Sequence, residues 1–389
     1  YESAGSFFVP MKKYDYILAG GGCAGLSLVY HLLDSSLKDS NILILEPTLG
    51  EVPNKTWCYW NTAALPIHPE AARFSWNSFY LQQGKQQHQH GLEKLSYYHL
   101  NSHDFYAHVL EKIKYFPNVH FLKEEVSTIR CIENEVYVET KTSGTYSSSY
   151  VFDSRNFIGN EIQNILNQVF IGLRIKSKTP IFNPRSMGLM DFNTPSTSGF
   201  DFIYTLPFSS QEALIEYTAY TSEAREEKAL LDSLQAFLKQ KYGELEYEIT
   251  FQETGQIPMT TRVQTQTTGP RHVRIGTAAG WTKPSTGYTF AQIQENCNQL
   301  VTRLEKGATQ DLRFPRKSRF VFYDNILLSI AHHWPKRLPG LFINLFSTSS
   351  PDLVFRFLAE KTSFWEEIRL LSRLKFGIFL KGLTRYGTY

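Results

Sequence analysis

The sequence predicts a mixed α/β protein that opens with a parallel sheet, continues with antiparallel strands and ends in a helical region. Three observations support this fold class. Residues 14–47 contain an apolar run, a glycine-rich turn, a helical stretch and a second apolar run, which is a βαβ pattern. In the middle of the chain, several segments alternate with the period of a strand. From about residue 311 the chain is rich in Phe and Leu at mostly helical spacing.

The predicted elements can be placed along the chain in order. We expect strands over residues 14–20, 41–47, 119–132, 134–156 and 272–280. We expect helices over residues 20–36, 102–116, 225–243 and 292–307. Ser102 is the N-cap candidate of the second helix, and Gly243 ends the third. A hairpin is expected within 200–222, where two strand-like runs flank Pro-Phe-Ser-Ser-Gln.

Composition bounds the core and the classes of partner. The chain has 389 residues, 42% hydrophobic and 14% aromatic, which is enough for a large core and two domains. A net charge of +3 gives no global footprint for nucleic acid, so we expect no such partner. The aromatic excess suits either a pocket for large apolar molecules or an ordinary core. The four cysteines form no CxxC pair, so we expect no disulfide scaffold and a reducing cytoplasm.

The two ends of the chain bear on membrane contact. The start lacks the apolar run and cleavage site of a signal peptide, and Met11 is a candidate natural start after an extension over residues 1–10. No window has 18 uninterrupted apolar residues, so we expect no transmembrane helix. Near the C-terminus, an apolar helical stripe consists of Phe364, Ile368, Leu371, Leu374 and Ile378, and the basic residues around it are Arg369, Arg373, Lys375, Lys381 and Arg385. This pattern predicts either a helix in a membrane interface or a terminal helix packed on its own domain.

The glycine-rich turn predicts a dinucleotide site. Gly20, Gly22 and Gly25 fit G-x-G-x-x-G after a strand and at the start of a helix. The first glycine allows the tight turn, the second lets the backbone approach a pyrophosphate, and the third lets the helix pack on the strand. The helix N-terminus offers N–H groups to the phosphates. Glu46 ends the second strand, where an acidic side chain accepts hydrogen bonds from ribose hydroxyls.

A second glycine-rich loop, GTAAGWTKPSTGYTF at 276–290, lies between the late strand and the following helix. A pure NAD dehydrogenase would continue with alternating strands and helices, whereas this chain turns to antiparallel-looking strands and returns with this loop. The pattern favours an FAD fold, in which a late strand and helix approach the pyrophosphate and the flavin. The alternative is a surface loop that closes a hairpin.

The sequence resembles the lycopene cyclase family, flavoproteins that close the ends of linear carotenoids into rings. The resemblance covers nearly the whole chain from Tyr14, and the pairing of TKPSTGY with LIEYT is specific. It rests on the glycine fingerprint, NKTWCYW (54–60), PIFNPRSMGLMDF (180–192), FIYTLPFSSQEALIEYT (202–218), TGQIPMT (254–260), GTAAGWTKPSTGYTF (276–290) and RFLAEKTSFWEEI (356–368). Two positions depart from the family pattern. Tyr217 stands where many members carry a second acid beside the hairpin Glu, and Asn183 stands where others have Asp.

The resemblance implies a domain organisation and a set of flavin contacts. A Rossmann-like FAD-binding domain of the glutathione-reductase/hydroxybenzoate-hydroxylase type is expected over 11–75, 100–178 and 250–310. An antiparallel carotenoid domain is expected over 76–99 and 179–249, and a helical, possibly membrane-facing region over 311–389. The flavin contacts implied in the second glycine-rich loop are Gly280, Lys283, Pro284, Ser285, Thr286 and Gly287.

The resemblance also implies an activity. The reaction is the conversion of the ψ end groups of lycopene to β-ionone rings, through γ-carotene to β-carotene, with no net redox change. The implied cofactor is FAD in its reduced form, with NAD(P)H as reductant for the flavin. The implied partners are lycopene, other acyclic carotenoids and the lipid of a membrane to which a cytoplasmic protein is peripherally bound. The β ring is favoured over the ε ring only as the common bacterial outcome, and cyclisation of one or both ends stays open, as does the oligomeric state.

The implied chemistry requires a strong acid that is kept dry, because alkenes are poor bases. A carboxylic acid in an apolar tunnel is suitable, since desolvation raises its pKa and keeps it protonated near neutral pH. The resemblance makes Glu216, in the apolar strand ALIEYTAY, our candidate for this acid. A carboxylate in such a strand is either paired or functional, and from the residues alone an exposed Glu on a half-buried strand is the favoured interpretation. Asp191 is the next candidate, as a partner of Glu216, as the base for the final proton, or as a structural cap. Aromatic candidates for the polyene wall, or for ordinary core packing, are Trp57, Tyr59, Trp60 and Trp281.

Other functions were weighed against cyclisation. Of His99, His103 and His108, only the first pair has the i, i+4 spacing of a helix, and no HExxH motif with its carboxylate follows, so we expect no metal. A flavin-dependent monooxygenase or prenyl reductase acting on an apolar lipid would consume NAD(P)H stoichiometrically and change the product mass. A non-catalytic, carotenoid-binding flavoprotein would have lost the acid, and Glu216 argues against it.

Overall fold

The computed structural model describes residues 12–51, 54–155, 165–195, 199–262, 267–308, 312–374 and 376–387. The expectation that Met11 begins the natural chain concerns residues outside these ranges. Within them, no helix is both long and apolar enough to cross a membrane.

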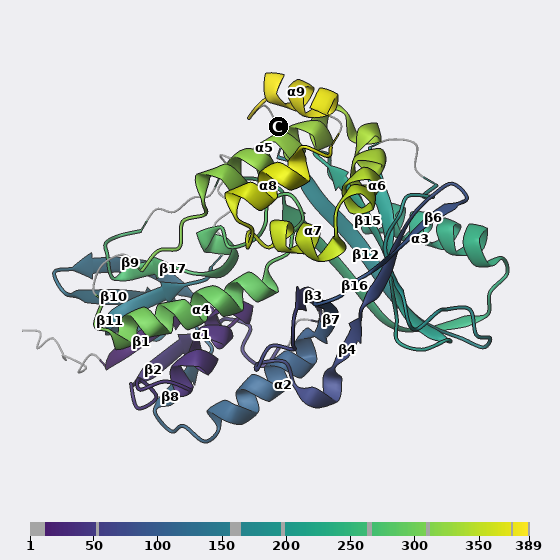
Figure 1. Ribbon diagram of the computed structural model, residues 1–389. Helices are drawn as coiled ribbons and strands as arrows, with labels where there is room; N and C mark the ends of the chain where they lie inside the picture. The colour runs from purple at the N-terminus through teal and green to yellow at the C-terminus, as the bar shows by residue number, and fades with distance from the viewer. Residues whose placement is uncertain are drawn as a thin grey trace, which may run out of the picture.

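The first sheet has seven strands and a parallel core that begins with the predicted βαβ unit (Figure 1). Its parallel strands are β8 (Val119–Leu122), β2 (Ile42–Leu45), β1 (Lys13–Ala19), β11 (Thr145–Asp153) and β17 (His272–Arg274). Two antiparallel strands, β10 (Glu135–Thr140) and β9 (Val126–Ile132), extend the edge beside β11. Its helices are α1 (Cys23–Leu33), α2 (Ser102–Ile113) and α4 (Phe290–Glu305). The N-cap of α2 is Asn101, whose side chain accepts from the His103 N–H, one residue before the predicted cap.

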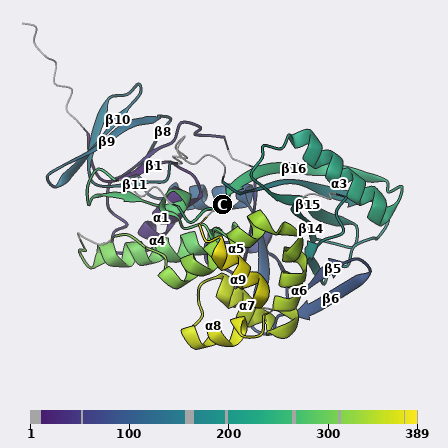
Figure 2. The ribbon, with the colours of Figure 1, turned by 90° about the horizontal axis from the view of Figure 1, so that it is seen from above.

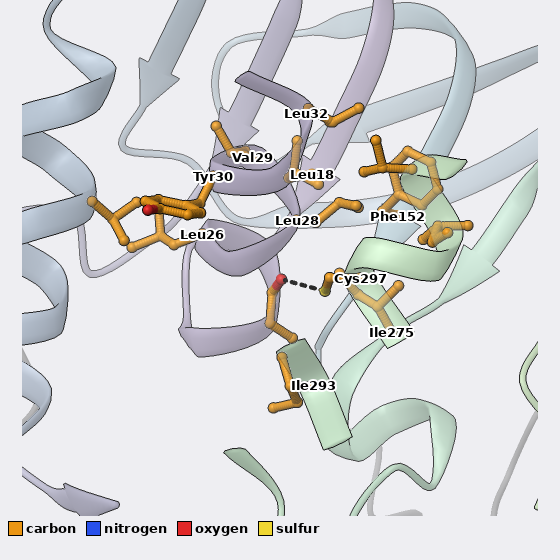
Figure 3. Close-up of a cluster of buried hydrophobic side chains, with 14 of the residues drawn as sticks. Leu18, Leu26, Leu28, Val29, Tyr30, Leu32, Phe152, Ile275, Ile293 and Cys297 are labelled. Atoms are coloured by element: carbon orange, nitrogen blue, oxygen red, sulfur yellow. Dashed lines mark hydrogen bonds between the residues drawn. The ribbon is translucent and has the colours of Figure 1, made fainter. Parts of the chain in front are cut away.

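A dense apolar core fixes α1 and α4 to this sheet. Figure 3 shows Leu28 of α1 directed toward Phe152 of β11, within a cluster that also contains Leu18. The Sγ atom of Cys297 in α4 lies 3.7 Å from the carbonyl oxygen of Ala24 in α1. This contact joins residues that are far apart in the sequence. The N-terminal turn and the helix after the second glycine-rich loop therefore share one core.

The second sheet also has seven strands and is antiparallel except where β13 pairs with β5. Its order is β16 (Tyr247–Pro258), β12 (Asn167–Ser177), β15 (Glu212–Thr221), β14 (Phe200–Pro207), β13 (Met187–Asp191), β5 (Ser78–Gln83) and β6 (Gln86–Gly91). The expected hairpin is β14–β15. Helix α3 (Glu227–Tyr242) covers one face and ends at Gly243, as predicted. The other face packs against the C-terminal helices.

Strands β12 and β16 correct two predicted boundaries. Residues 100–178 and 250–310 were assigned to the dinucleotide-binding part, yet β12 pairs with β15 on one side and with β16 on the other. Both strands therefore belong to the antiparallel sheet. A small third sheet of β3 (Thr56–Asn61), β7 (Ser96–Asn101) and β4 (Phe74–Trp76), with the short helix η1 (Glu70–Ala72), lies between the two large ones (Figure 1).

The C-terminal region is helical, as predicted. Figure 2, seen from above, shows its helices between the parallel-sheet part and the antiparallel sheet. They are α5 (Ser318–His333), η3 (Pro335–Arg337), α6 (Leu338–Thr348), α7 (Pro351–Leu358), α8 (Phe364–Leu371) and α9 (Phe376–Thr384). The expected single amphipathic helix is in fact two, because α8 ends at Leu371, and Leu374 between them is buried.

Candidate functional site

The N-terminal glycines form a cradle for an anionic group. Gly20 has a φ of +111°, and a Cβ there would lie 2.3 Å from Ser154 Oγ. A Cβ on Gly25 would lie 2.2 Å from the Gly20 carbonyl oxygen, so α1 packs on the turn only because Gly25 has no side chain. Gly22 caps α1 without a side-chain hydrogen bond, and a Cβ there would meet no atom within 4 Å. The first turn of α1 thus presents backbone N–H groups to open space, as a pyrophosphate requires.

Glu46 lies beside this cradle at the end of β2. Its Oε2 accepts from the Gly21 N–H at 2.8 Å, and its Oε1 accepts from the Thr48 N–H at 3.0 Å. These bonds hold the carboxylate against the glycine turn, in the place expected of a ribose ligand.

The second glycine-rich loop approaches the cradle from the other end of the chain. Its first residues form the short helix η2 (Gly276–Ala279), and a Cβ on Gly276 would lie 2.6 Å from the Cβ of Ala24 in α1. Gly280 is left-handed, with φ 72° and ψ 27°. Gly280, Thr286 and Gly287 line a cavity that lies beside this loop.

Three other residues of the loop lie elsewhere. Lys283 is buried, and its Nζ lies 2.8 Å from Asp324 Oδ1 of α5 and 3.2 Å from Glu360 Oε1. Ser285 Oγ donates to Asp324 Oδ1 at 2.6 Å. Pro284 is buried between them and does not line this cavity. The side chains of Lys283 and Ser285 anchor the loop to the C-terminal helices, and contact of Lys283, Pro284 and Ser285 with the cofactor stays a prediction.

The cavity lies between the glycine-rich loops and the antiparallel sheet, and its volume is about 480 Å³. Apart from Trp57, its aromatic wall was not predicted. The wall comes from β3, β7, β12, β14, β15, the second glycine-rich loop and the C-terminal helices. The aromatic residues are Trp57, Tyr97, Phe170, Phe202, Tyr204, Tyr220, Tyr288, Phe290, Phe342, Phe346 and Phe355. Tyr59, Trp60 and Trp281 line a separate cavity of about 520 Å³ on the other side of the loop.

Glu216 projects into the aromatic cavity from β15. It pairs with Tyr204 of β14, while its neighbours Ile215 and Tyr217 pack on the opposite, α3-covered face. Glu216 Oε1 accepts from the Thr218 hydroxyl at 2.7 Å. Burial and, second, the charge of Glu253 raise the pKa of Glu216 to about 8, which keeps this carboxyl protonated at neutral pH.

Glu253 is the functional candidate that sequence reasoning missed. It lies on β16, lines the same cavity and is 5% exposed. Its Oε2 accepts from the Thr56 N–H at 2.8 Å, and its Oε1 is buried with no hydrogen-bond partner among the described residues. Burial raises the pKa of Glu253, although the bond from Thr56 opposes the shift. The sequence signal was a carboxylate in the residue before TGQIPMT, inside a strand with little apolar alternation.

Asp191 does not meet Glu216. It pairs with Ile203 of β14, whose side chain packs on the α3 face of the sheet. Asp191 Oδ2 lies 2.7 Å from Nζ of Lys241 in α3. The expectation that Asp191 assists the acid is therefore corrected, because its carboxylate forms a buried ion pair on the far side of the sheet.

The cavity offers no metal chemistry from the residues that can be placed. Within the described ranges, no three His, Cys, Asp or Glu side chains come close enough to hold a metal ion. The site is therefore two carboxyl groups and an aromatic wall beside an anion cradle.

Solved structures with a similar architecture show the fold class of this chain. The chain resembles a geranylgeranyl bacteriochlorophyll reductase-like protein from Thermoplasma acidophilum, with a TM-score of 0.62 and 12% identity, over 95% of this chain and 98% of that one. It also resembles the halogenase PltM in complex with phloroglucinol and FAD, with a TM-score of 0.58 and 14% identity, over 89% and 82%. The expected fold class is confirmed.

The chain belongs to the lycopene cyclase protein family, whose profile matches residues 15–381. Lycopene beta-cyclase of Pseudescherichia vulneris is 27% identical over 292 residues, which cover 71% of this chain and 70% of that one. Lycopene beta-cyclase of Paracoccus sp. (strain N81106 / MBIC 01143) is 24% identical over 392 residues, which cover 92% and 93%. The resemblance seen in the sequence is confirmed, and family membership supports carotenoid cyclisation.

Proposed function

We propose that this chain cyclises the ψ end groups of lycopene and related acyclic carotenoids to β-ionone rings, as an FAD-dependent isomerase of the intramolecular lyase type. One observation supports this most directly. The carboxyl group of Glu216, whose pKa is raised by burial, lies in an aromatic cavity next to a dinucleotide cradle, in a member of the lycopene cyclase family. No redox step is needed, because the reaction moves a proton and a carbon–carbon bond.

Glu216 acts as the acid. Its proton adds to the terminal C=C of the substrate, and the tertiary cation that results is attacked by a neighbouring C=C, which closes the ring. Loss of a proton beside the second cation then forms the ring double bond. The dry cavity keeps the carboxyl protonated until the alkene arrives, and general acid catalysis of this kind contributes about 10²–10⁴-fold.

The aromatic wall excludes water and stabilises the positive charge. Tyr97 and Tyr288 share a hydrogen bond of 2.5 Å between their hydroxyls, and Tyr204 donates to Tyr97 at 2.8 Å. Hydroxyls that bond to one another leave the ring faces and edges for the apolar substrate. An aromatic face within about 6 Å of a cation contributes roughly 0.5–2 kcal/mol.

FAD fits the residues of the cradle. Gly20, Gly22 and Gly25 would hold the pyrophosphate, Glu46 the ribose, and the loop residues Gly280, Thr286 and Gly287 the flavin side. When bound in its reduced form, FAD supplies negative charge that favours the carbocation. NAD(P)H is the proposed reductant, needed only to reduce the flavin and not in each turnover.

The surface of α8 and α9 is proposed to contact a membrane from the cytoplasmic side. Phe364, Trp365 and Ile368 of α8 are 55%, 76% and 41% exposed, and Leu380 and Leu383 of α9 are 62% and 46% exposed. The same segment of the chain contains the basic residues Arg369, Arg373, Lys381 and Arg385. An exposed apolar patch with a basic rim is typical of proteins that bind anionic lipid.

The proposed function is tested with Glu216→Gln in a lycopene-accumulating host and in the purified, flavin-reduced protein. The amide cannot protonate an alkene, so we expect bound flavin to remain and cyclic products to disappear. Glu212→Gln, on the same strand, is the matched control and should cyclise like the wild type. Full activity of Glu216→Gln would assign the acid elsewhere. Product mass separates cyclisation, which leaves it unchanged, from oxygenation or reduction, which do not.

A further inference from the structure

Two carboxyl groups face each other across a single glycine in the sheet. Glu216 of β15 and Glu253 of β16 both pair with Gly172 of β12. Strand β12 lies between β15 and β16 (Figure 1), so the side chains of both Glu residues project from the same face of the sheet as position 172. Strands are about 4.8 Å apart, which places the two Cα atoms roughly 10 Å apart. A Cβ on Gly172 would lie 3.2 Å from Glu253 Cγ and 3.5 Å from its Oε1, so the glycine leaves room for the carboxyl to lean toward its neighbour.

The two carboxyl groups have different hydrogen-bond partners. Glu253 accepts from the Thr56 backbone N–H, which can only donate and therefore favours the ionised form. The charge of Lys55 also favours the ionised form of Glu253. Glu216 is bonded to the Thr218 hydroxyl, which can donate or accept and so suits either form. Two buried carboxyl groups this close share one proton, and these partners place it on Glu216.

We propose that Glu253 is the catalytic base that removes the last proton of the cyclisation, so that Glu216 and Glu253 form an acid–base pair on one wall of the cavity. This inference rests on the proposed function. Its second support is the buried Oε1 of Glu253, which has no hydrogen-bond partner among the described residues and lies in a side chain that lines the cavity.

The step balances without an added reactant. The Glu216 carboxyl gives its proton to the terminal C=C, and the new C–C bond moves the cation into the ring. The adjacent ring C–H then gives its proton to Glu253 Oε1, and the electron pair of that bond becomes the ring C=C. Glu253 now carries one proton and Glu216 carries none. Transfer of that proton back to Glu216 restores the pair for the next end group.

The decisive experiment uses the reduced holoenzyme in D₂O with lycopene, and compares Glu253→Gln with Glu216→Gln. The acid of Glu253→Gln is intact, so it still protonates the alkene, but the cation returns its proton because the base is missing. We expect cyclisation to fall by about 10²-fold or more, while the recovered lycopene gains deuterium at the CH carbon of its terminal C=C. Glu216→Gln should give neither product nor deuterium. Glu248→Gln, an exposed position on the same strand, should behave like the wild type.

The outcomes separate this inference from the proposed function. One outcome overturns only the role of Glu253: the wild type cyclises lycopene, Glu216→Gln fails to cyclise it, and Glu253→Gln cyclises it at the wild-type rate. A wild-type protein that fails to cyclise lycopene overturns the proposed function itself. Loss of product from Glu253→Gln with no deuterium in the substrate would show that Glu253 positions the acid, and would also overturn the assignment as base.

The wild-type pH profile provides a test that does not depend on the folding of a variant. Glu253 must be ionised to accept the proton, so the rate should fall as pH falls through its pKa, which burial places above the ordinary 4.5. The groups that face it are Glu216, Lys55 and the Thr56 N–H. Glu253→Asp should keep this acidic limb at a lower rate. A wild-type rate that stays level from pH 7 to 4.5 with flavin retained would overturn the base role.

Discussion

The buried acid should make the folded protein less stable as the pH rises, and Glu216→Gln should remove that effect. The pKa of Glu216 is raised from 4.5 to about 8, so between these values the folded state holds a proton that the unfolded state has lost. Stability from this group is therefore fully present below the unfolded pKa and is lost as pH rises toward the folded pKa. The Glu216 side chain lines the cavity, so the raised pKa reflects desolvation of its carboxyl group at the proposed site of catalysis.

The magnitude follows from the size of the shift. Each pH unit in this window costs about 1.4 kcal/mol of unfolding free energy, so the wild type should lose roughly 2 to 3 kcal/mol between pH 6 and pH 8 from Glu216 alone. Glu216→Gln has no such proton to lose. Its stability relative to the wild type should therefore increase by the same amount over the same interval.

The measurement is urea unfolding of the holoprotein at pH 6, 7 and 8, with FAD saturating, followed by tryptophan fluorescence. Glu70→Gln, at a side chain that is 90% exposed, is the matched control and should keep the wild-type pH dependence. A difference between Glu216→Gln and the wild type that is the same at all three pH values would refute the reasoning, because the carboxyl would then have one protonation state in both forms of the chain.

Three further predictions concern the cradle, the corrected carboxylate and the exposed patch. Gly22→Ala should keep the wild-type melting temperature but lose bound FAD. Gly25→Ala, whose Cβ would lie 2.2 Å from a carbonyl oxygen, should lower the free energy of unfolding by about 1–3 kcal/mol. Melting curves and flavin absorbance distinguish the two variants. Asp191→Asn should lower the unfolding free energy by up to about 3–5 kcal/mol, because its lysine partner is left unpaired, with the cyclisation rate per bound flavin unchanged. Trp365→Ser should weaken sedimentation with anionic liposomes by about tenfold or more, since one buried aromatic side chain contributes roughly 1.5–3 kcal/mol; Tyr115→Ser, equally exposed on another part of the molecule, should have no effect.

The sequence predicted what local spacing determines. The glycines at 20, 22 and 25 define their own turn, since each role depends on neighbours a few residues away. Strand alternation correctly placed Glu216 and Tyr217 on opposite faces of the sheet, whereas the choice of Glu216 as the acid depended on the family resemblance. The family resemblance supplied the chemistry, which no spacing in the chain specifies.

The parts that were missed depend on pairing between distant segments. Glu253 becomes a neighbour of Glu216 only because two strands from different parts of the chain flank Gly172, and no local pattern gives that register. Asp191 was predicted as a partner of the acid, but its register on β13 directs it to the opposite face. The side chain of Lys283 points toward Asp324 of α5, a helix in the C-terminal region, and no local pattern around Lys283 predicts that contact.

The salt-bridged anchor of the second glycine-rich loop has a practical consequence for dissecting this protein. Lys283 of that loop and Arg316 share the same two carboxylates, Asp324 and Glu360, one on α5 and one just after α7. Deletion of the C-terminal helices to test lipid binding would thus disturb helices that hold the second glycine-rich loop in place. A loss of activity could then result from the disturbed loop and not from lost lipid binding. Single substitutions at exposed positions are therefore preferable, because they change the surface and leave these ion pairs intact.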